Sequence, residues 1–136
     1  IQVRTLGLYT ILEEIIMIKG CIADCKLEDA GFHYTMTLIQ GKYKMFILYA
    51  LAEFGVVRFN ALKKFIGEIS FKTLSKTLKD LESDGLIHRE EYPQVPPKVE
   101  YSLTKRGESL IPILDQLCIW GEKHRLDSLH PDPIAK

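Results

Sequence analysis

The sequence has no excess charge of either sign, few cysteines and no long apolar run. Its 136 residues carry 18 basic and 18 acidic side chains, so the net charge does not point to a nucleic-acid or membrane partner. The apolar stretch at residues 6–12 is interrupted by Glu13 and Glu14, which leaves it too short to cross a bilayer. It also lacks the basic start and the small-residue cleavage site of a signal peptide. We therefore expect a cytoplasmic protein.

Catalytic and metal-binding patterns are also lacking. Cys21, Cys25 and Cys118 are an odd number of cysteines, which does not fit a disulfide framework. Cys21 and Cys25 are four residues apart, but no histidine follows at the spacing of a zinc finger. No glycine-rich phosphate loop, nucleophile elbow or conspicuous carboxylate pair occurs. We expect no metal, no cofactor and no enzymatic activity.

The basic residues are concentrated in the middle of the chain. Residues 58–106 carry ten basic and seven acidic side chains, whereas residues 1–31 and 107–136 each carry three basic and five acidic ones. Neutrality of the whole chain therefore hides a modestly basic centre. The local field at that centre matters more than net charge for the attraction of phosphate groups.

Apolar periodicity predicts three helices in the first half of the chain. Residues 5–18 are amphipathic, but the chain begins with Ile1 and Met17 could serve as a later start, so residues 1–16 carry little weight in the fold prediction. Residues 35–54 follow the pattern of one helix that ends at Gly55. A further helix is predicted at about residues 58–65, ending at Gly67.

The next helix, predicted at residues 70–83, has two contrasting faces. Ser70 is a suitable N-cap because its hydroxyl can accept a hydrogen bond from a free backbone N–H. The apolar face, at spacings of three, four and three, consists of Phe71, Leu74, Leu78 and Leu81. The opposite face consists of Lys72, Thr73, Ser75, Lys76, Lys79 and Asp80.

A β-hairpin is predicted at residues 86–103. Val99, Tyr101 and Leu103 alternate with polar residues at the period of a half-buried strand. The intervening loop contains three prolines, which cannot donate to a strand ladder. Thr104 is expected to cap a last helix, which Pro112 should kink or divide in two.

The elements predicted from residue 58 to residue 103 have the order of a winged helix-turn-helix: a helix, a short turn, an amphipathic helix and a hairpin. In that fold the second helix enters the major groove of DNA. The fold class expected is therefore α+β and mainly α. Two alternatives remain open, because lysines on an amphipathic helix are typical of a solvated surface and because winged helices also serve as protein–protein interaction modules.

Three ungapped segments resemble the HxlR family of bacterial winged helix-turn-helix regulators, in the MarR-like superfamily. They are Ile69-Ser70-Phe71-Lys72-Thr73-Leu74-Ser75, the run from Leu78 to Ile87, and the run from Val95 to Thr104. Further positions that match are Arg58-Phe59, Gly107, Leu117 and Trp120-Gly121. The likeness covers roughly residues 35–121. It implies a cytosolic homodimer that binds a palindromic operator and controls transcription as a repressor or an activator.

The resemblance also assigns roles along the chain. Residues 70–83 become the recognition helix and residues 86–103 the wing. The expected domains are an N-terminal dimerisation extension (1–31), the DNA-binding domain (32–106) and a C-terminal dimerisation helix and tail (107–136). The residues expected to contact double-stranded DNA are Arg58, Ser70, Lys72, Thr73, Ser75, Lys76, Lys79, Arg89 and Lys98. Those expected at the dimer interface are Ile11, Ile15, Leu114, Leu117 and Trp120.

The chain departs from the family pattern where many members carry a sensor cysteine, because Ala30 stands at that position. Cys25 lies upstream beside Lys26, whose charge favours the reactive thiolate, so Cys25 is our candidate redox sensor; an ordinary cysteine is the alternative. The effector could instead be a small molecule between the terminal helices and the winged domain, or there could be none. Lys98 replaces a more usual arginine and lacks its planar fork.

Overall fold

The computed structural model describes residues 26–129, with side chains up to residue 125. The chain divides into two compact units with the boundary between Gln40 and Gly41. The described part of the first unit holds a short 3-10 helix, η1 (Leu27–Asp29), and α2 (Gly31–Ile39). The helix predicted at residues 5–18 lies outside the described residues, as do the candidate residues Ile11, Ile15, Cys21 and Cys25.

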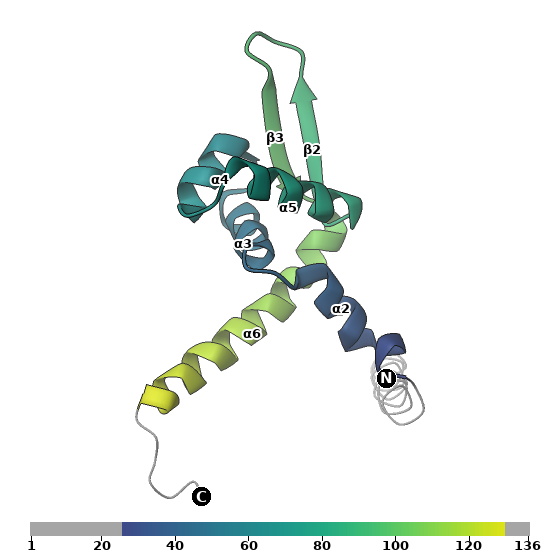
Figure 1. Ribbon diagram of the computed structural model, residues 1–136, viewed down its shortest axis with the longest axis vertical. Coiled ribbons are helices and arrows are strands. Elements are labelled where there is room, and N and C mark those ends of the chain that lie inside the picture. The colour runs from purple at the N-terminus through teal and green to yellow at the C-terminus, as the bar shows by residue number, and fades with distance from the viewer. Residues whose placement is uncertain (1–25, 130–136) are drawn as a thin grey trace, which may run out of the picture. The chain divides into compact units, whose positions relative to one another are not determined.

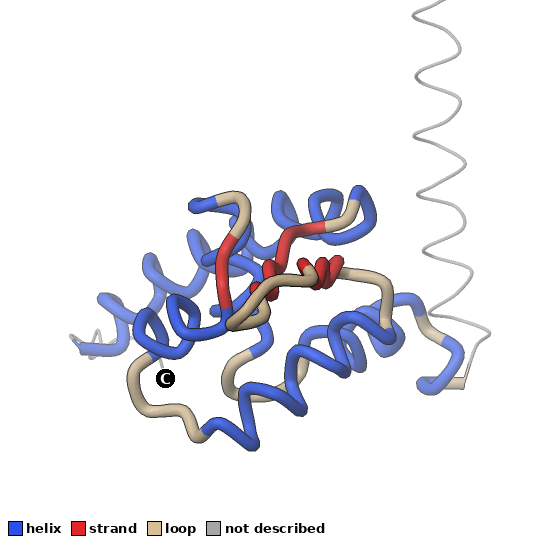
Figure 2. Tube along the Cα trace, turned by 90° about the horizontal axis from the view of Figure 1, so that it is seen from above, coloured by secondary structure: helices blue, strands red, loops and turns tan. Residues whose placement is uncertain are grey.

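The second unit is a winged helix-turn-helix, as the sequence predicts. Its elements in chain order are α3 (Lys44–Phe54), β1 (Val57–Arg58), α4 (Phe59–Ile66), α5 (Phe71–Ser83), β2 (Ile87–Tyr92), β3 (Lys98–Leu103) and α6 (Lys105–Leu129). The three strands form an antiparallel sheet in the order β1-β3-β2. The β2–β3 hairpin projects well past α4 and α5 (Figure 1). Viewed along the hairpin, the strands lie among the helices rather than at an outer edge (Figure 2).

The core lies where α3, α4 and α5 meet the sheet and the start of α6. Its largest fully buried side chains include Ile47, Leu48, Leu51, Leu62, Leu74, Leu78, Leu81, Leu86, Ile87 and Leu114. The apolar stripe predicted on residues 70–83 thus anchors α5, with the exception of Phe71, whose side chain is 61% exposed. Burying a leucine side chain stabilises a fold by about 1.5–3 kcal/mol, so three buried leucines hold α5 firmly in place.

The single helix predicted at residues 35–54 is wrong, because the structure has two helices there, α2 and α3. Gly41, between them, has a φ of +120°, a backbone conformation that lies outside the helical region. Tyr43 directly precedes α3, and its hydroxyl donates a hydrogen bond to the Glu68 carbonyl oxygen at 2.8 Å. The sequence pattern does not reveal this break because apolar residues recur at short intervals on both sides of it.

Strand β1 was not predicted, since two residues are too short for a period-two pattern. Val57 is buried and pairs with Tyr101 of β3, and Arg58 pairs with Glu100. Of the two outcomes predicted at Pro112, a kink or a division of the last helix, the division is wrong, because α6 continues through Pro112. Tyr49 of α3 lies beside Asp115 of α6, and burial, followed by this carboxylate, raises the pKa of Tyr49 to about 12.

The start of α6 is joined closely to the base of the hairpin. The Thr104 hydroxyl donates to the Gly85 carbonyl oxygen at 2.6 Å and accepts from the Gly107 N–H at 3.0 Å, which confirms the predicted cap. Gly107 is buried, and a Cβ at this position would overlap the Leu86 carbonyl oxygen and lie 3.2 Å from a Leu103 methyl group. Only glycine therefore fits where α6 crosses the hairpin.

Candidate nucleic-acid interface

Helix α5 begins with the cap that the sequence predicts. The Ser70 hydroxyl oxygen accepts from the Thr73 backbone N–H at 3.1 Å, and the same hydroxyl donates to the Thr73 Oγ1 at 2.8 Å. Ser70 and Thr73, both predicted to contact DNA, are exposed, but their hydroxyls are already hydrogen-bonded to each other. Their main effect in the free protein is to fix the first turn of the helix.

The rest of the exposed face of α5 is basic and polar. Lys72, Ser75, Lys76 and Lys79 are all exposed. The Lys76 ammonium lies 3.0 Å from Asp80, one turn along the helix, and its side chain is 78% exposed. Exposed pairs of this kind contribute only about 0.3–0.5 kcal/mol, so a phosphate group can replace the carboxylate. Among the side chains that the structure describes, those of residues 26–125, Lys72 and Lys79 take part in no ion pair.

The hairpin differs from this face because its charges are paired within it. Residues 87–103 contain two basic residues that are always charged, Arg89 and Lys98, and three glutamates. Arg89 lies 3.2 Å from Glu91, and a hydrogen bond to Tyr101 is the main reason that the pKa of Arg89 is raised. The Lys98 ammonium lies 2.8 Å from the Glu100 carboxylate.

Glu100 is a charged group at this surface that the sequence pattern did not single out. The hydrogen bond from Lys98 lowers the pKa of Glu100, and the charge of Arg58, its partner in strand pairing, acts in the same direction. The Lys98 ammonium also lies 4.9 Å from the centre of the Tyr92 ring. Two of the predicted DNA contacts, Arg58 and Lys98, therefore flank one carboxylate at the edge of the hairpin.

Phe71 of α5, which the apolar pattern places in the core, is exposed instead, and the half-buried Phe59 of α4 lies beside it. Phe71 stacks on Phe59 with ring centres 5.5 Å apart, and the Lys63 ammonium lies 4.9 Å from the Phe71 ring. A ring flanked by a cation is held by both apolar and electrostatic contact. No period-based signal could have revealed this cluster, because it joins two helices across a turn.

The residues predicted at a dimer interface divide into two groups. Leu114 is 1% exposed and belongs to the core of its own chain, so it presents no surface to a partner. Leu117 and Trp120 are 50% and 65% exposed, and the Trp120 ring stacks on His124 with centres 4.2 Å apart. Ile113 is also half exposed and lies one turn before Leu117. Cys118, which lies next to Leu117 on α6, is an exposed free thiol.

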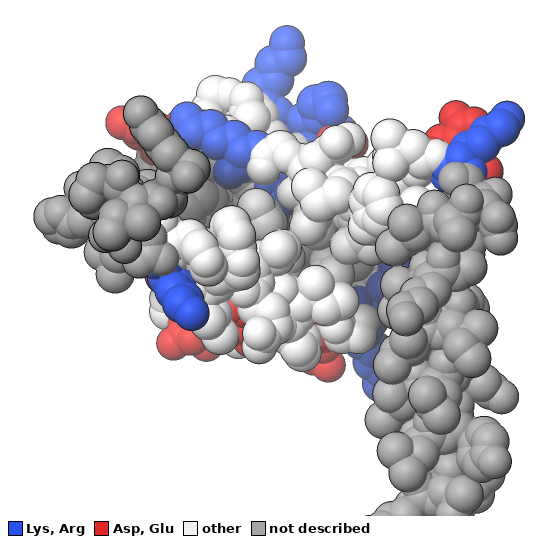
Figure 3. Space-filling view, turned by 90° about the horizontal axis from the view of Figure 1, so that it is seen from below, with Lys and Arg blue, Asp and Glu red and all other residues white. Residues whose placement is uncertain are grey.

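Seen from below, charged side chains are sparse over the centre of the view and gather towards its rim (Figure 3). A separate cavity of about 470 Å³ lies between α3, β3 and α6, and its lining includes Leu51, Val56, Leu103 and Glu108.

No group of three histidine, cysteine, aspartate or glutamate residues close enough to hold a metal ion occurs among residues 26–129. Within the same residues, none of the helices has the length and apolar character needed to cross a membrane.

Comparison with known proteins identifies a family and individual relatives that match most of this chain. The family model of the HxlR-like helix-turn-helix proteins matches residues 38–128. An HTH-type transcriptional regulator of Halalkalibacterium halodurans is 58% identical over 99 residues, which cover 73% of this chain and 88% of the relative. The HTH-type transcriptional regulator YdzF of Bacillus subtilis is 50% identical over 97 residues, which cover 71% of this chain and 89% of YdzF.

Solved structures give the same result for the fold. The redox regulator HypR in its reduced form superposes with a TM-score of 0.69 and is 42% identical, and the match covers 73% of this chain and 99% of HypR.

Proposed function

The chain belongs to the HxlR-like helix-turn-helix family of transcriptional regulators, and from this premise we propose that it is a homodimer that binds a palindromic operator through α5 and the β2–β3 hairpin. The observation that carries the proposal is the exposed face of α5, where Lys72, Ser75 and Lys76 point away from a helix anchored by buried leucines. A helix of 13 residues is about 20 Å long, which is ample for the few side chains that read base edges in the major groove.

The two parts of the interface have different tasks under this proposal. Helix α5 carries Lys72 and Lys79, which no carboxylate of the described residues holds in an ion pair, so it supplies the attraction to phosphates and the contacts to base edges. The hairpin has its cations held by glutamates, so it contributes less attraction and mainly fixes the position of the protein on the duplex. The net charge of zero agrees with a protein whose affinity depends on a local patch.

The dimer is expected to form through α6. Ile113, Leu117 and Trp120 follow one another at spacings of four and three, which places them in one exposed apolar stripe. A stripe of this kind suits an isologous two-fold contact, in which the same surface of both protomers meets. The two α5 helices would then enter successive major grooves, about 34–36 Å apart.

The experiment that tests DNA binding begins by selecting duplexes from a random-sequence library with the full chain. Affinity for the selected duplex is then measured at several salt concentrations for Lys72→Ala, Lys76→Ala and a control, Lys123→Ala, on α6. Each lost phosphate contact lowers the logarithmic salt slope by about 0.9. Because the dimer has two copies of each lysine, the first two variants are expected to lose affinity and about 1.8 units of slope. The control should behave as the wild type.

If neither α5 variant changes affinity or slope, or if no duplex is selected, the chain is better described as a winged-helix protein–protein interaction module. The proposal assigns the protein no catalytic activity and places its action in the cytoplasm, where it meets chromosomal DNA.

We also propose that Cys25 makes the regulator responsive to oxidants. The support comes from HypR, which is named a redox regulator, and from Lys26, whose charge next to Cys25 favours the thiolate. Hydrogen peroxide should weaken DNA binding by the wild type and by Cys118→Ser, whereas Cys25→Ser should keep its affinity. Full oxidant-dependent release of DNA by Cys25→Ser would exclude this role.

A further inference from the structure

The first residue of α5, Phe71, has a large apolar side chain that the fold leaves outside the core. Its side chain is 61% exposed, whereas that of Leu74, three residues later, is fully buried. Helix α5 begins at Phe71 directly after the Ser70 cap, so the backbone that carries the ring is fixed. Base contacts of a recognition helix concentrate in its N-terminal residues. The ring therefore lies between Ser70 and Lys72, two residues expected to contact DNA.

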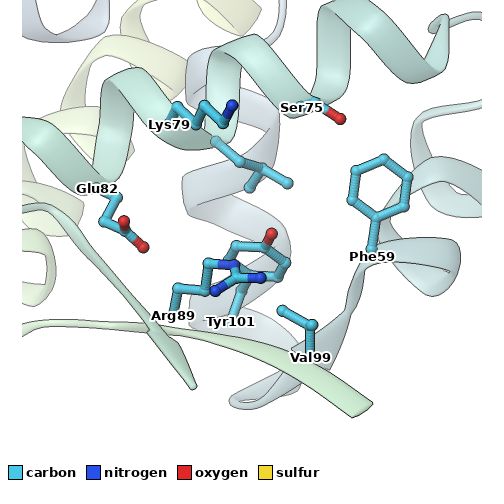
Figure 4. A pocket seen from close by; sticks show the side chains of 8 residues that line it. Phe59, Ser75, Lys79, Glu82, Arg89, Val99 and Tyr101 are labelled. Carbon is cyan, nitrogen blue, oxygen red and sulfur yellow. The ribbon is translucent and has the colours of Figure 1, made fainter. Parts of the chain in front are cut away.

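Two contacts hold the Phe71 ring in place. It stacks on the Phe59 ring with centres 5.5 Å and planes 18° apart, and the Lys63 ammonium lies 4.9 Å from its centre. In the cavity between α5 and the hairpin, Phe59 lies at the same end as Ser75 (Figure 4), so the stacked rings lie beside the N-terminal half of α5. A ring that its neighbours already hold loses little further freedom when it makes a new contact.

A phenyl ring can recognise only one of the groups that the major groove presents. It has no charge to attract a phosphate group, and it has no donor or acceptor for the polar groups of base edges. The apolar group on those edges is the C5-methyl group of thymine, against which a phenylalanine side chain can pack. The ring therefore adds a contact to α5 that its lysines and serines cannot make.

We propose that Phe71 is a specificity-determining residue that packs against the C5-methyl group of a thymine in each half of the operator. This inference rests on the proposed function and extends it to a residue outside the list of expected DNA contacts. Within the part of the chain whose side chains are described, Lys63 takes part in no ion pair, so the cation beside the ring is available to a phosphate group. Lys63 and Lys72 then supply attraction, and Phe71 selects the base.

The wild-type protein tests the proposal on modified duplexes. In the duplex selected from the random-sequence library, thymines are replaced by deoxyuridine in symmetric pairs, one position of each half-site at a time. This change removes the methyl group and leaves the base-pairing groups intact. Burial of one methyl group corresponds to about fourfold in affinity, and burial of two to about 15-fold. We expect one symmetric pair to lower affinity about 15-fold and the other pairs less than about twofold.

The variant Phe71→Ala connects this effect to the ring. It should bind the thymine duplex about 15-fold more weakly than the wild type, and its sensitivity to deoxyuridine at the same pair should fall below about twofold. Such a loss of sensitivity is expected when the ring and the methyl group act through one interaction. Circular dichroism shows whether the variant is folded.

The matched control is Phe54→Ala. Phe54 is 59% exposed and also contacts one aromatic ring, that of Phe65, but it lies at the end of α3. The control should keep both the affinity of the wild type and its sensitivity to deoxyuridine.

Wild-type protein that is insensitive to deoxyuridine at every symmetric pair would overturn the proposal, and this arm needs no variant to fold. Sensitivity that persists unchanged in Phe71→Ala would overturn it as well. So would a loss of affinity in Phe71→Ala that is equal on the thymine and deoxyuridine duplexes, because the ring would then contact the sugar–phosphate backbone.

Failure of this inference is distinguishable from failure of the proposed function. If Lys72→Ala and Lys76→Ala weaken DNA binding as expected but deoxyuridine has no effect, DNA binding stands and the role of Phe71 is refuted. If no duplex is selected, or if neither lysine variant changes affinity or slope, the proposed function fails and the role of Phe71 fails with it.

Discussion

Replacement of Glu100 by glutamine should strengthen DNA binding, because it frees Lys98. In the wild type the Lys98 ammonium lies 2.8 Å from the Glu100 carboxylate, and both side chains are largely covered, at 27% and 20% exposure. Lys98 must leave this partner before it can contact a phosphate group. Glutamine keeps the size of the side chain and removes its charge, so that the lysine becomes available at no cost in shape.

The expected magnitude follows from the number of lysines that the substitution frees. Two protomers supply two such lysines, and each new phosphate contact adds about 0.9 to the logarithmic salt slope. A slope steeper by about 1.8 means that the loss of affinity between 50 and 200 mM salt is roughly tenfold larger than in the wild type. Fluorescence anisotropy with the selected duplex at four or five salt concentrations measures this change.

Two further variants separate release of Lys98 from a general change of charge. Glu122→Gln removes one negative charge from α6 and should leave the slope unaltered. The double variant Glu100→Gln, Lys98→Gln should show no gain over Lys98→Gln alone, as expected when two residues act through one interaction. A wild-type slope in Glu100→Gln, or a gain that persists in the double variant, would refute the reasoning.

Three other substitutions test the remaining parts of the structure. Gly107→Ala should destabilise the fold by about 3 kcal/mol or more in urea denaturation, because the new methyl group overlaps the backbone of Leu86. The control Gly121→Ala, whose new Cβ would have no neighbouring atom within 4 Å, should stabilise the helix by about 0.5–1 kcal/mol. Equal effects of the two substitutions would contradict the close crossing described for Gly107. Trp120→Ala should raise the dimer dissociation constant about 100-fold in sedimentation equilibrium, since two copies are lost, whereas Ile119→Ala, which removes an exposed apolar side chain outside the stripe, should not. Tyr49→Phe should resist alkaline unfolding, because above pH 10 the unfolded wild type loses the phenol proton that the folded protein keeps to about pH 12. The wild type should therefore lose about 2–3 kcal/mol of stability relative to the variant across that window, and identical pH profiles would exclude the effect.

The sequence was informative where one face of an element carries one kind of residue. The leucines at positions 74, 78 and 81 predicted the inward face of α5, and the alternation around Tyr101 predicted β3, because burial imposes a period that can be counted. The break at Gly41 was missed, since apolar residues recur at short intervals both before and after it.

The candidate interface was less accessible to prediction than the fold. A list of basic residues treats Lys72 and Lys98 alike, yet only the structure reveals that Lys98 is paired with a carboxylate on its own strand. The cavity between α5 and the hairpin joins residues that are up to 42 positions apart, from Phe59 to Tyr101, and no local pattern connects them. Contacts of this range depend on how the elements pack, which periodicity does not encode.

Hydroxyl-radical footprinting of the full chain on its selected duplex tests the central claim most directly. A homodimer that places α5 of each protomer in successive major grooves should protect two patches related by two-fold symmetry, with centres about 10 base pairs apart. The protection should disappear in a folded Lys72→Ala, Lys76→Ala double variant. A single patch, or two protected patches that persist unchanged in the double variant, would contradict the account.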